Sequence, residues 1–244
     1  MHRGLRGDFD IRNQILLSTR PDAQTFLQPR LVARRLSLGQ TLYDEGEPVT
    51  HAIFPHEGMI SFMTETSDGR GVEKGSVGYE GFIGFTLMMG GGEATSRSVV
   101  QVPGYASWVS IADLDEAIAA FPCVREAMLR YLKCLIVQLL ESVACNSLHN
   151  ADQRVSRWLL EAHDRIAGNT LQVTQEALSQ ALGLRRATVN AVCTKLMDEG
   201  AIHYARGELS VLSDRKLKRH SCECYGRIRR NFEKGAHYSF KSSD

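Results

Sequence analysis

The stretch TQEALSQALGLRRATVNAVCTKLMDEGAI, residues 174–202, predicts two helices separated by a sharp turn. Thr174 is a suitable N-cap for the first helix, whose apolar face consists of Ala177, Leu178, Ala181 and Leu182. Gly183 ends this helix, because glycine readily adopts the left-handed conformation of a helix C-terminus. The second helix begins near Arg185, and its apolar face consists of Val189, Val192, Cys193 and Leu196. Two short β-prone runs follow around a turn at 206–207, so the whole order predicts a winged helix-turn-helix.

Two adjacent arginines, Arg185 and Arg186, stand at the start of the second predicted helix. A cation at a helix N-terminus is mildly unfavourable, because it lies at the positive end of the helix dipole. The two arginines are therefore poorly explained as ordinary solvent-exposed residues. In a helix-turn-helix, the second helix enters the DNA major groove and its first residues reach base edges. Arginine matches guanine and asparagine matches adenine, whereas a threonine also binds phosphate. We predict DNA contacts from Thr174, Gln175, Arg185, Arg186, Thr188, Asn190, Lys195 and Arg206.

The charge distribution supports a polyanionic partner for the last part of the chain. The sequence carries 29 lysines and arginines against 28 aspartates and glutamates, a net charge of +1. From residue 150 onward the counts are 16 and 11, and before it they are 13 and 17. A basic second part behind an acidic first part indicates two domains, of which the second faces double-stranded DNA.

The composition is that of a cytoplasmic globular protein. No run approaches the roughly 18 apolar residues of a membrane span, so no membrane partner is expected. The opening MHRGLRGDFDIRNQ lacks the apolar core of a signal peptide. The six cysteines are scattered rather than arrayed as a disulfide framework, and we expect them to be reduced.

Residues 36–111 are rich in glycine, with short apolar runs between the glycines. Short strands separated by glycine turns predict an all-β barrel or sandwich. RPDAQTFL, at 20–27, precedes this region and predicts a short helix that starts at Pro21 and Asp22.

Residues 124–148 contain neither glycine nor proline, which favours one long helix. Its apolar residues fall alternately 3 and 4 positions apart, at Leu129, Leu132, Ile136, Leu139 and Val143. Such a seam is typical of a coiled coil, and we expect it to join two copies in a homodimer. The alternative is a stripe that packs on the core of its own domain.

The chain resembles the Crp/Fnr family of bacterial transcription regulators from about residue 20 to 232. The resemblance is strongest in CNSLHNADQRVSRWLLEAHDRI (145–166), TQEALSQALGLRRATV (174–189), GAIHYARGELSVL (200–212) and CECYGRIRR (222–230). It implies an α+β chain with a cyclic-nucleotide-binding-like β-roll at 1–123, a dimerisation helix and hinge at 124–150, and a winged helix-turn-helix at 151–244. It also implies a near-palindromic DNA site, RNA polymerase as a partner, and an effector sensed by the roll.

The family pattern carries over to only part of the second helix. The family's guanine-reading arginine falls on Arg186, and a further threonine contact falls on Thr188. The best-known members have a glutamate and a second arginine at the positions of Ala187 and Ala191. The half-site is therefore expected to differ, with Arg185 or Asn190 supplying the missing readout.

The segment GYEGFIGFTLMMGGGEATSRSVVQVPG, residues 78–104, resembles the family's phosphate-binding cassette. The resemblance implies that the following residues are candidates for lining an effector pocket: Gly81, Gly84, Phe85, Arg97, Ser98, Leu139 and Leu140. Binders of cyclic AMP carry a glutamate where Phe85 stands and small hydroxyls where Leu139 and Leu140 stand. Two missing hydrogen bonds cost on the order of 2 kcal/mol together, which argues against cyclic AMP. The effector and any cofactor stay unidentified.

The cysteines and histidines give only weak metal signals. No cysteine precedes Cys123, which excludes the N-terminal cysteine cluster of the family's oxygen sensors. His220, Cys222 and Cys224 form a compact group, but structural zinc sites usually pair ligands as C-x₂₋₄-C. Cys145 and His149 lie one turn apart near the hinge, where metal binding, redox chemistry and simple packing are all open. Packing is the expectation for both groups, and no metal is predicted.

The sequence thus predicts a homodimeric, sequence-specific DNA-binding regulator. The alternative is a ligand- or partner-binding module whose helix-turn-helix is only a scaffold. No G-x-S-x-G, H-E-x-x-H or P-loop motif is present, so no enzymatic activity is expected.

Overall fold

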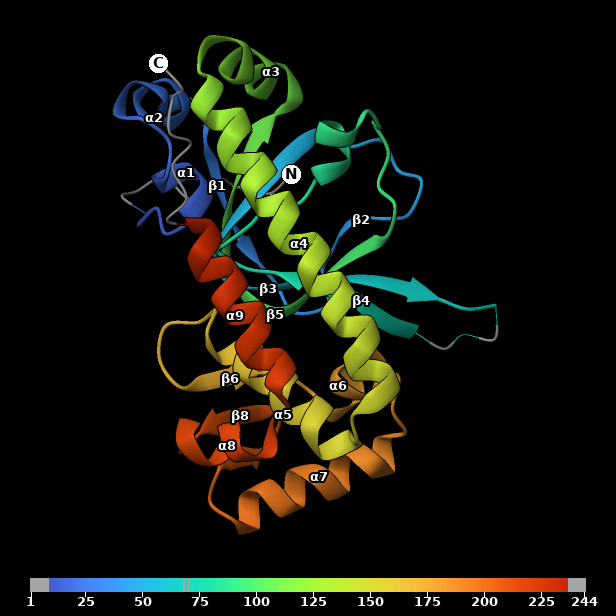
Figure 1. Ribbon diagram of the computed structural model, residues 1–244. Coiled ribbons are helices and arrows are strands. Elements are labelled where there is room, and N and C mark those ends of the chain that lie inside the picture. Colours follow the sequence, from blue (N-terminus) through green and yellow to red (C-terminus); the bar gives the residue numbers. More distant parts are fainter. Residues whose placement is uncertain (1–8, 68, 70, 237–244) are drawn as a thin grey trace.

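The computed structural model describes residues 9–67, 69 and 71–236 (Figure 1). The first part contains α1 (Gln14–Leu17), α2 (Pro21–Leu27), the 3₁₀ turn η1 (Gln28–Arg30), β1 (Val32–Leu36), β2 (Thr41–Tyr43), β3 (His51–Glu65), β4 (Gly71–Val77), η2 (Phe85–Met89), β5 (Arg97–Ser110) and α3 (Ile111–Ala120). The second part contains α4 (Pro122–Leu148), α5 (Ala151–His163), β6 (Thr170–Gln172), α6 (Gln175–Leu182), α7 (Arg186–Asp198), β7 (Ile202–Ala205), β8 (Glu208–Val211), α8 (Asp214–His220) and α9 (Glu223–Ala236).

The first part folds as a β-roll. Its antiparallel sheet has the order β1-β5-β3-β4, with β2 paired to β5. The two long strands, β3 and β5, shift register between Pro55 and Ile60, where their backbones approach closely. A Cβ atom on Gly104 would lie 2.0 Å from the Glu57 carbonyl oxygen, so this close approach of the two backbones requires glycine. The prediction of a glycine-rich β domain is confirmed.

Helix α4 closes the roll on one side. Pro122 occupies its first turn, where a missing N–H costs nothing. Val124, Met128, Tyr131 and Leu135 are buried against the roll core. Helix α3, capped by the Ser110 side chain, precedes α4 and was not predicted from the sequence.

The second domain is a winged helix-turn-helix, as predicted. An Asn150–Gln153 capping box starts α5, and the three short strands form a sheet in the order β6-β8-β7. Trp158, Leu178 and Leu196 lie in its core. The α+β architecture is thereby confirmed.

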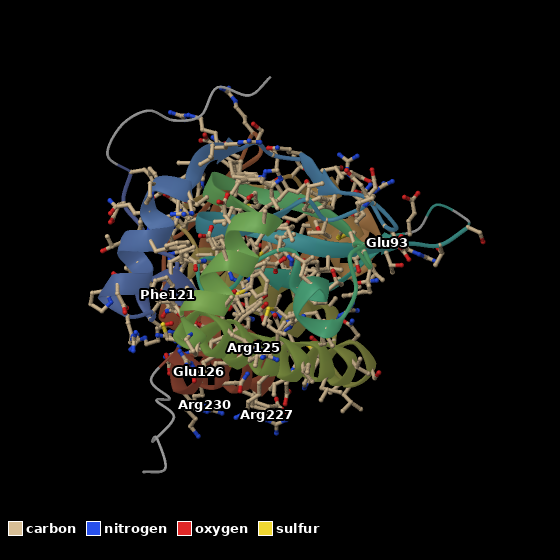
Figure 2. The ribbon with its side chains drawn as sticks, turned by 90° about the horizontal axis from the view of Figure 1, so that it is seen from above. Glu93, Phe121, Arg125, Glu126, Arg227 and Arg230 are labelled. Carbon is tan, nitrogen blue, oxygen red and sulfur yellow. The ribbon has the colours of Figure 1, made fainter. Side chains whose placement is uncertain are left out.

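The C-terminal helix α9 returns antiparallel along α4 (Figure 1). The Tyr131 and Phe232 rings are 6.3 Å apart, and the Asn231 side-chain amide donates to the Cys134 carbonyl at 3.2 Å. The charged side of α9 faces outward, and Arg227 and Arg230 point away from the body of the molecule (Figure 2). Sequence reasoning missed this helix, although Tyr225, Ile228 and Phe232 have helical spacing.

The roll and the winged helix are joined directly as well as through α4. The buried Arg165 guanidinium lies 2.6 Å from the Glu80 carboxylate and 2.8 Å from the Ser76 hydroxyl. The Trp158 indole donates to the Glu73 carboxylate at 3.0 Å. Among the helices that the structure describes, none is long and apolar enough to cross a membrane.

Candidate functional site

Helix α7 lies at the end of the molecule opposite α3 (Figure 1). Val189, Val192, Cys193 and Leu196 are buried on its inner side. The residues predicted to touch DNA on its other side, Arg185, Arg186 and Asn190, are exposed, and Thr188 is half-buried. The helix therefore presents a polar, basic face to solvent, and this face is the candidate DNA interface.

The turn before α7 is fixed by local hydrogen bonds. Thr174 caps α6 by accepting from the Ala177 N–H at 3.0 Å. Gly183 has φ +59°, and the Leu184 N–H bonds to the Ser179 carbonyl at 3.0 Å. Arg185 then takes the extended N-cap conformation from which α7 starts. These bonds set the direction in which α7 leaves the turn.

The two arginines at the start of α7 carry free guanidinium groups. Among the described residues, neither Arg185 nor Arg186 forms an ion pair, and both are exposed. Lys195, at the far end of α7, contacts Asp152 of α5 instead. An unpaired cation at a helix N-terminus is mildly unfavourable in the free protein, so an external anion would relieve it.

Asn190 is oriented by a second predicted contact residue. The Gln175 side-chain amide donates to the Asn190 amide oxygen at 3.1 Å. This bond links the first turn of α6 to the outer side of α7 and leaves the Asn190 NH₂ group without a protein partner among the described residues.

The wing is a two-residue hairpin. Arg206 has φ +52° and Gly207 has φ +82°, the left-handed pair of a type I′ turn. The Tyr204 hydroxyl donates to the Val173 carbonyl at 3.2 Å and accepts from the Gln175 N–H at 3.1 Å. The wing is therefore tied to the start of α6, with Arg206 exposed at its tip.

The candidate effector pocket is nearly filled by side chains. Gly84 has φ +97° and is the N-cap of η2. The Phe85 ring meets the Phe62 ring edge-on at 5.3 Å between centroids. Only about 10 Å³ of space is left there, beside the buried Ser98.

Other pocket candidates face elsewhere. Arg97 is exposed and pairs with Asp44 at 2.6 Å and Glu65 at 3.5 Å. Gly81 packs against the Tyr131 ring of α4. Leu139 lies over Gly75 of β4, whereas Leu140 is 65% exposed, so the two leucines do not line one pocket.

The apolar seam of α4 is divided between two sides of the helix. Leu132 is buried in the core of its own chain, and Leu139 packs against that core. The outward stripe consists of Leu129, Ile136, Leu140 and Val143, which are 43–67% exposed. The predicted core contact is therefore present, and the exposed stripe differs from the predicted seam, because it includes Leu140 and lacks Leu132 and Leu139.

Four side chains of types that can ligate a metal converge where α4 ends. Cys145 and His149 meet Cys222 and Cys224, although the two pairs are far apart in the sequence. A hydrogen bond from the Cys145 thiol lowers the pKa of Cys222 to about 5, and burial raises the pKa of Cys224 to about 12. His220 lies outside the group, because its Nε2 is 2.7 Å from Glu199. The sequence had separated these residues into two weak candidates.

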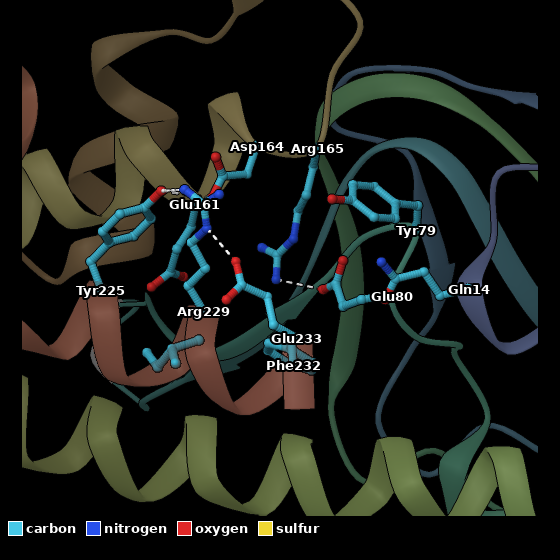
Figure 3. A pocket seen from close by; sticks show the side chains of 11 residues that line it. Gln14, Tyr79, Glu80, Glu161, Asp164, Arg165, Tyr225, Arg229, Phe232 and Glu233 are labelled. Atoms are coloured by element: carbon cyan, nitrogen blue, oxygen red, sulfur yellow. Dashed lines mark hydrogen bonds and ion pairs between the residues drawn. The ribbon is translucent and has the colours of Figure 1, made fainter. Parts of the chain in front are cut away.

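A cavity of about 160 Å³ lies between the roll, α5 and α9 (Figure 3). Arg165 reaches Glu80 on one side, and Arg229 reaches Glu233 at 2.9 Å on the other. The Tyr225 hydroxyl donates to Asp164 at 2.9 Å, while burial raises the pKa of Asp164. Its polar groups are largely paired with one another, so this cavity belongs to the interdomain contact.

Comparison with known proteins identifies the second domain. The model of the Crp-like helix-turn-helix domain matches residues 153–220. No curated protein matched the chain.

Several solved structures share the fold. The c-di-GMP responsive global regulator CLP of Xanthomonas campestris is 16% identical, with a TM-score of 0.62 over 80% of this chain and 100% of its own. FixK2 of Bradyrhizobium japonicum is 16% identical, with a TM-score of 0.60 over 79% and 98%. A CRP-family transcriptional regulator of Thermus thermophilus is 20% identical, with a TM-score of 0.61 over 77% and 96%.

Proposed function

We propose that this chain, which combines a Crp-like helix-turn-helix domain with the fold of the Crp/Fnr regulators, is a transcription regulator that binds a near-palindromic DNA site as a homodimer. The observation that carries the proposal is the exposed, unpaired Arg185–Arg186 pair at the start of α7. Its guanidinium groups stand where a recognition helix meets base edges.

Each contact residue has a distinct role in this proposal. Arg186 reads guanine through its O6 and N7 atoms, and Asn190, held by Gln175, presents its NH₂ group to a base acceptor. Arg206 at the wing tip and the N-terminus of α6 at Thr174 contact phosphates, which position the domain without specifying sequence. Lys195 reaches a phosphate only by leaving Asp152.

The second copy is proposed to pack on the outward stripe of α4. Leu129, Ile136, Leu140 and Val143 follow one another at spacings of 7, 4 and 3 residues on the side of α4 that its own roll leaves uncovered. Two such stripes form a coiled-coil contact that places both α7 helices on one DNA duplex. RNA polymerase is the further partner expected of a transcription regulator.

The roll is proposed to be the sensor domain, with an effector other than cyclic AMP. Phe85 occupies the inside of the cassette, and Arg97 is held by two carboxylates. To bind there, a nucleotide would have to displace the Phe85 ring, and its phosphate would have to replace the two carboxylates that pair with Arg97. The effector is therefore expected either to be small or to act with a rearrangement of η2.

Selection of binding sites from a random DNA library, followed by titration of the best site, tests the function. Arg186→Ala should weaken specific binding by about 1–3 kcal/mol per half-site, roughly 5- to 150-fold for each, because a bidentate guanine contact is lost. Arg230→Ala, an exposed arginine on the outer side of α9, is the matched control and should bind as the parent chain does.

Two results would contradict the proposal. The first is equal affinity of the parent chain for the selected site and for unrelated DNA at the same salt concentration. The second is unchanged affinity when Arg185 and Arg186 are both replaced by alanine, which would leave the helix-turn-helix as a scaffold.

A further inference from the structure

The cysteine–histidine tetrad of Cys145, His149, Cys222 and Cys224 joins two segments that are far apart in the sequence. Cys145 lies in the last turns of α4 and His149 is the C-cap of that helix. Cys222 lies between α8 and α9, and Cys224 is in the first turn of α9. The four ligand atoms all lie within 4.8 Å of one another.

Two distances within the tetrad are close to those between the ligands of a tetrahedral metal ion. Zinc–sulfur bonds of about 2.3 Å and zinc–nitrogen bonds of about 2.0 Å give a sulfur–sulfur edge of roughly 3.8 Å and a sulfur–nitrogen edge of roughly 3.5 Å. The Sγ atoms of Cys145 and Cys222 are 3.6 Å apart, and the Cys224 Sγ lies 3.6 Å from the His149 Nδ1. All three cysteines are free thiols, so none of these contacts is a disulfide.

The surroundings of the tetrad fit a closed structural site. The three cysteines are buried, from 0% exposed for Cys145 to 6% for Cys222, and the His149 side chain is 13% exposed. The other ring nitrogen of His149, Nε2, lies 3.4 Å from the Glu223 carboxylate. Metal-bound histidines commonly donate their second N–H to such a carboxylate, which fixes the ring and frees the first nitrogen for the metal.

We propose that Cys145, His149, Cys222 and Cys224 bind one zinc ion in a Cys₃His site that fastens α8 and α9 to the end of α4. Zinc suits this donor set because structural zinc sites are four-coordinate with sulfur and nitrogen ligands. Binding releases the thiol protons to solvent, and the ligand bonds add to the stability of the folded chain.

The position of the site gives it a consequence for the molecule. The chain passes directly from α4 through His149 into α5, so the tetrad sits at the connection between the roll and the winged helix. A bound ion would hold this connection in one geometry. Loss of the ion would release α9 from the end of α4 while leaving the helix-turn-helix core intact.

Metal content is the direct test, on the full chain purified under reducing conditions without added metal or chelator. Elemental analysis and native mass spectrometry should find one zinc per protomer. After removal with a chelator, Co²⁺ should bind in the same ratio and give the absorption of a tetrahedral thiolate site. Cys145→Ser should lose the metal, whereas Cys123→Ser, at the other end of α4 and outside the tetrad, should keep it.

A second variant guards against a misfolded Cys145→Ser. Glu223→Gln removes only the carboxylate beside His149, on a side chain that is 59% exposed. It should still load zinc, with an affinity about 10- to 100-fold weaker in competition with a chromophoric chelator.

Three results would overturn the site. One is a parent chain that stays metal-free on titration with zinc under reducing conditions. Another is unchanged stoichiometry and affinity in Cys145→Ser. The third is a Cys145–Cys222 disulfide in the freshly purified protein, detected as a loss of two hydrogens by mass.

Discussion

At the scale of single residues, Gly81 shows how closely the β-roll and α4 fit together. A Cβ atom at this position would lie 2.1 Å from the Tyr131 ring. The ring is fully enclosed between Phe82 and Phe232, at 5.5 and 6.3 Å between centroids, so it has little room to move. We expect Gly81→Ala to lower the free energy of unfolding by about 1–3 kcal/mol through overpacking.

Urea denaturation measures this cost. Gly92→Ala is the matched control, because a Cβ there meets no atom within 4 Å. Equal midpoints for the two variants would show that Tyr131 moves aside freely.

His56 is a buried histidine whose burial lowers its pKa to about 4. Its Nδ1 accepts the N–H groups of Arg12 and Asn13 at 3.2 Å, so a proton there would break both bonds. The unfolded chain binds this proton below a pH of about 6.5, whereas the folded chain resists it. Stability is therefore complete above about pH 6.5 and falls as the pH is lowered towards 4, by up to about 3 kcal/mol.

The free energy of unfolding, measured at several pH values between 4 and 7, tests this prediction. In His56→Gln the fall over this window should be smaller than in the parent chain. His203→Gln, at an exposed position in β7, should keep the parental slope. A parental slope in His56→Gln would assign the acid sensitivity to other groups.

At the scale of elements, α4 has two apolar sides. One packs on the roll through Met128, Tyr131 and Leu132, and the other presents Ile136 and Val143 to solvent. Ile136→Lys places two positive charges in the centre of the proposed dimer contact, one from each copy of the chain. We expect the dimer dissociation constant to rise about 100-fold or more.

Sedimentation at several protein concentrations measures the effect. Leu38→Lys changes a similarly exposed leucine, 42% exposed, on the roll and should leave the dimer intact. A parent chain that is monomeric at all concentrations would contradict the proposed contact.

Elements with a strong local signal could be predicted from the sequence. Thr174, Gly183 and the Arg206–Gly207 pair mark the winged helix-turn-helix through capping and turn geometry. The division of α4 could not be predicted, because spacings of 3 and 4 residues describe both a seam and a broad buried face. Leu132 and Leu139 were therefore placed together with Ile136, although they pack towards the roll.

The cysteine–histidine tetrad could not be predicted from the sequence for a different reason. Cys145 and His149 pair with Cys222 and Cys224 only because α9 turns back along α4, and no local pattern indicates that return. Residue type alone marked all four as possible ligands, while their partnership depends on tertiary structure.

At the scale of the whole molecule, the Arg165–Glu80 pair couples the two domains. Both side chains are buried, at 5% and 8% exposed. Arg165→Gln leaves the Glu80 carboxylate without its cation and should lower the free energy of unfolding by about 3–5 kcal/mol. Combining it with Glu80→Gln should recover part of the loss, because no buried charge then lacks its partner.

A double-mutant cycle in urea measures the coupling, and Arg20→Gln is the control. Arg20 pairs with Asp22 on the surface, where the two side chains are 65% and 51% exposed, so its loss should not change stability measurably. Strict additivity of the two buried substitutions would contradict a direct coupling between roll and winged helix.

The packing of α9 along α4 also has a consequence for folding during synthesis of the chain. A ribosome makes the roll and α4 well before α9, so the side of α4 that receives Phe232 stays uncovered until the winged helix has been synthesised. The close approach at Gly235, where a Cβ would lie 2.6 Å from the Cys134 sulfur, forms only after the winged helix has emerged. A nascent chain that has completed its β-roll and α4 therefore still lacks the packing that α9 supplies.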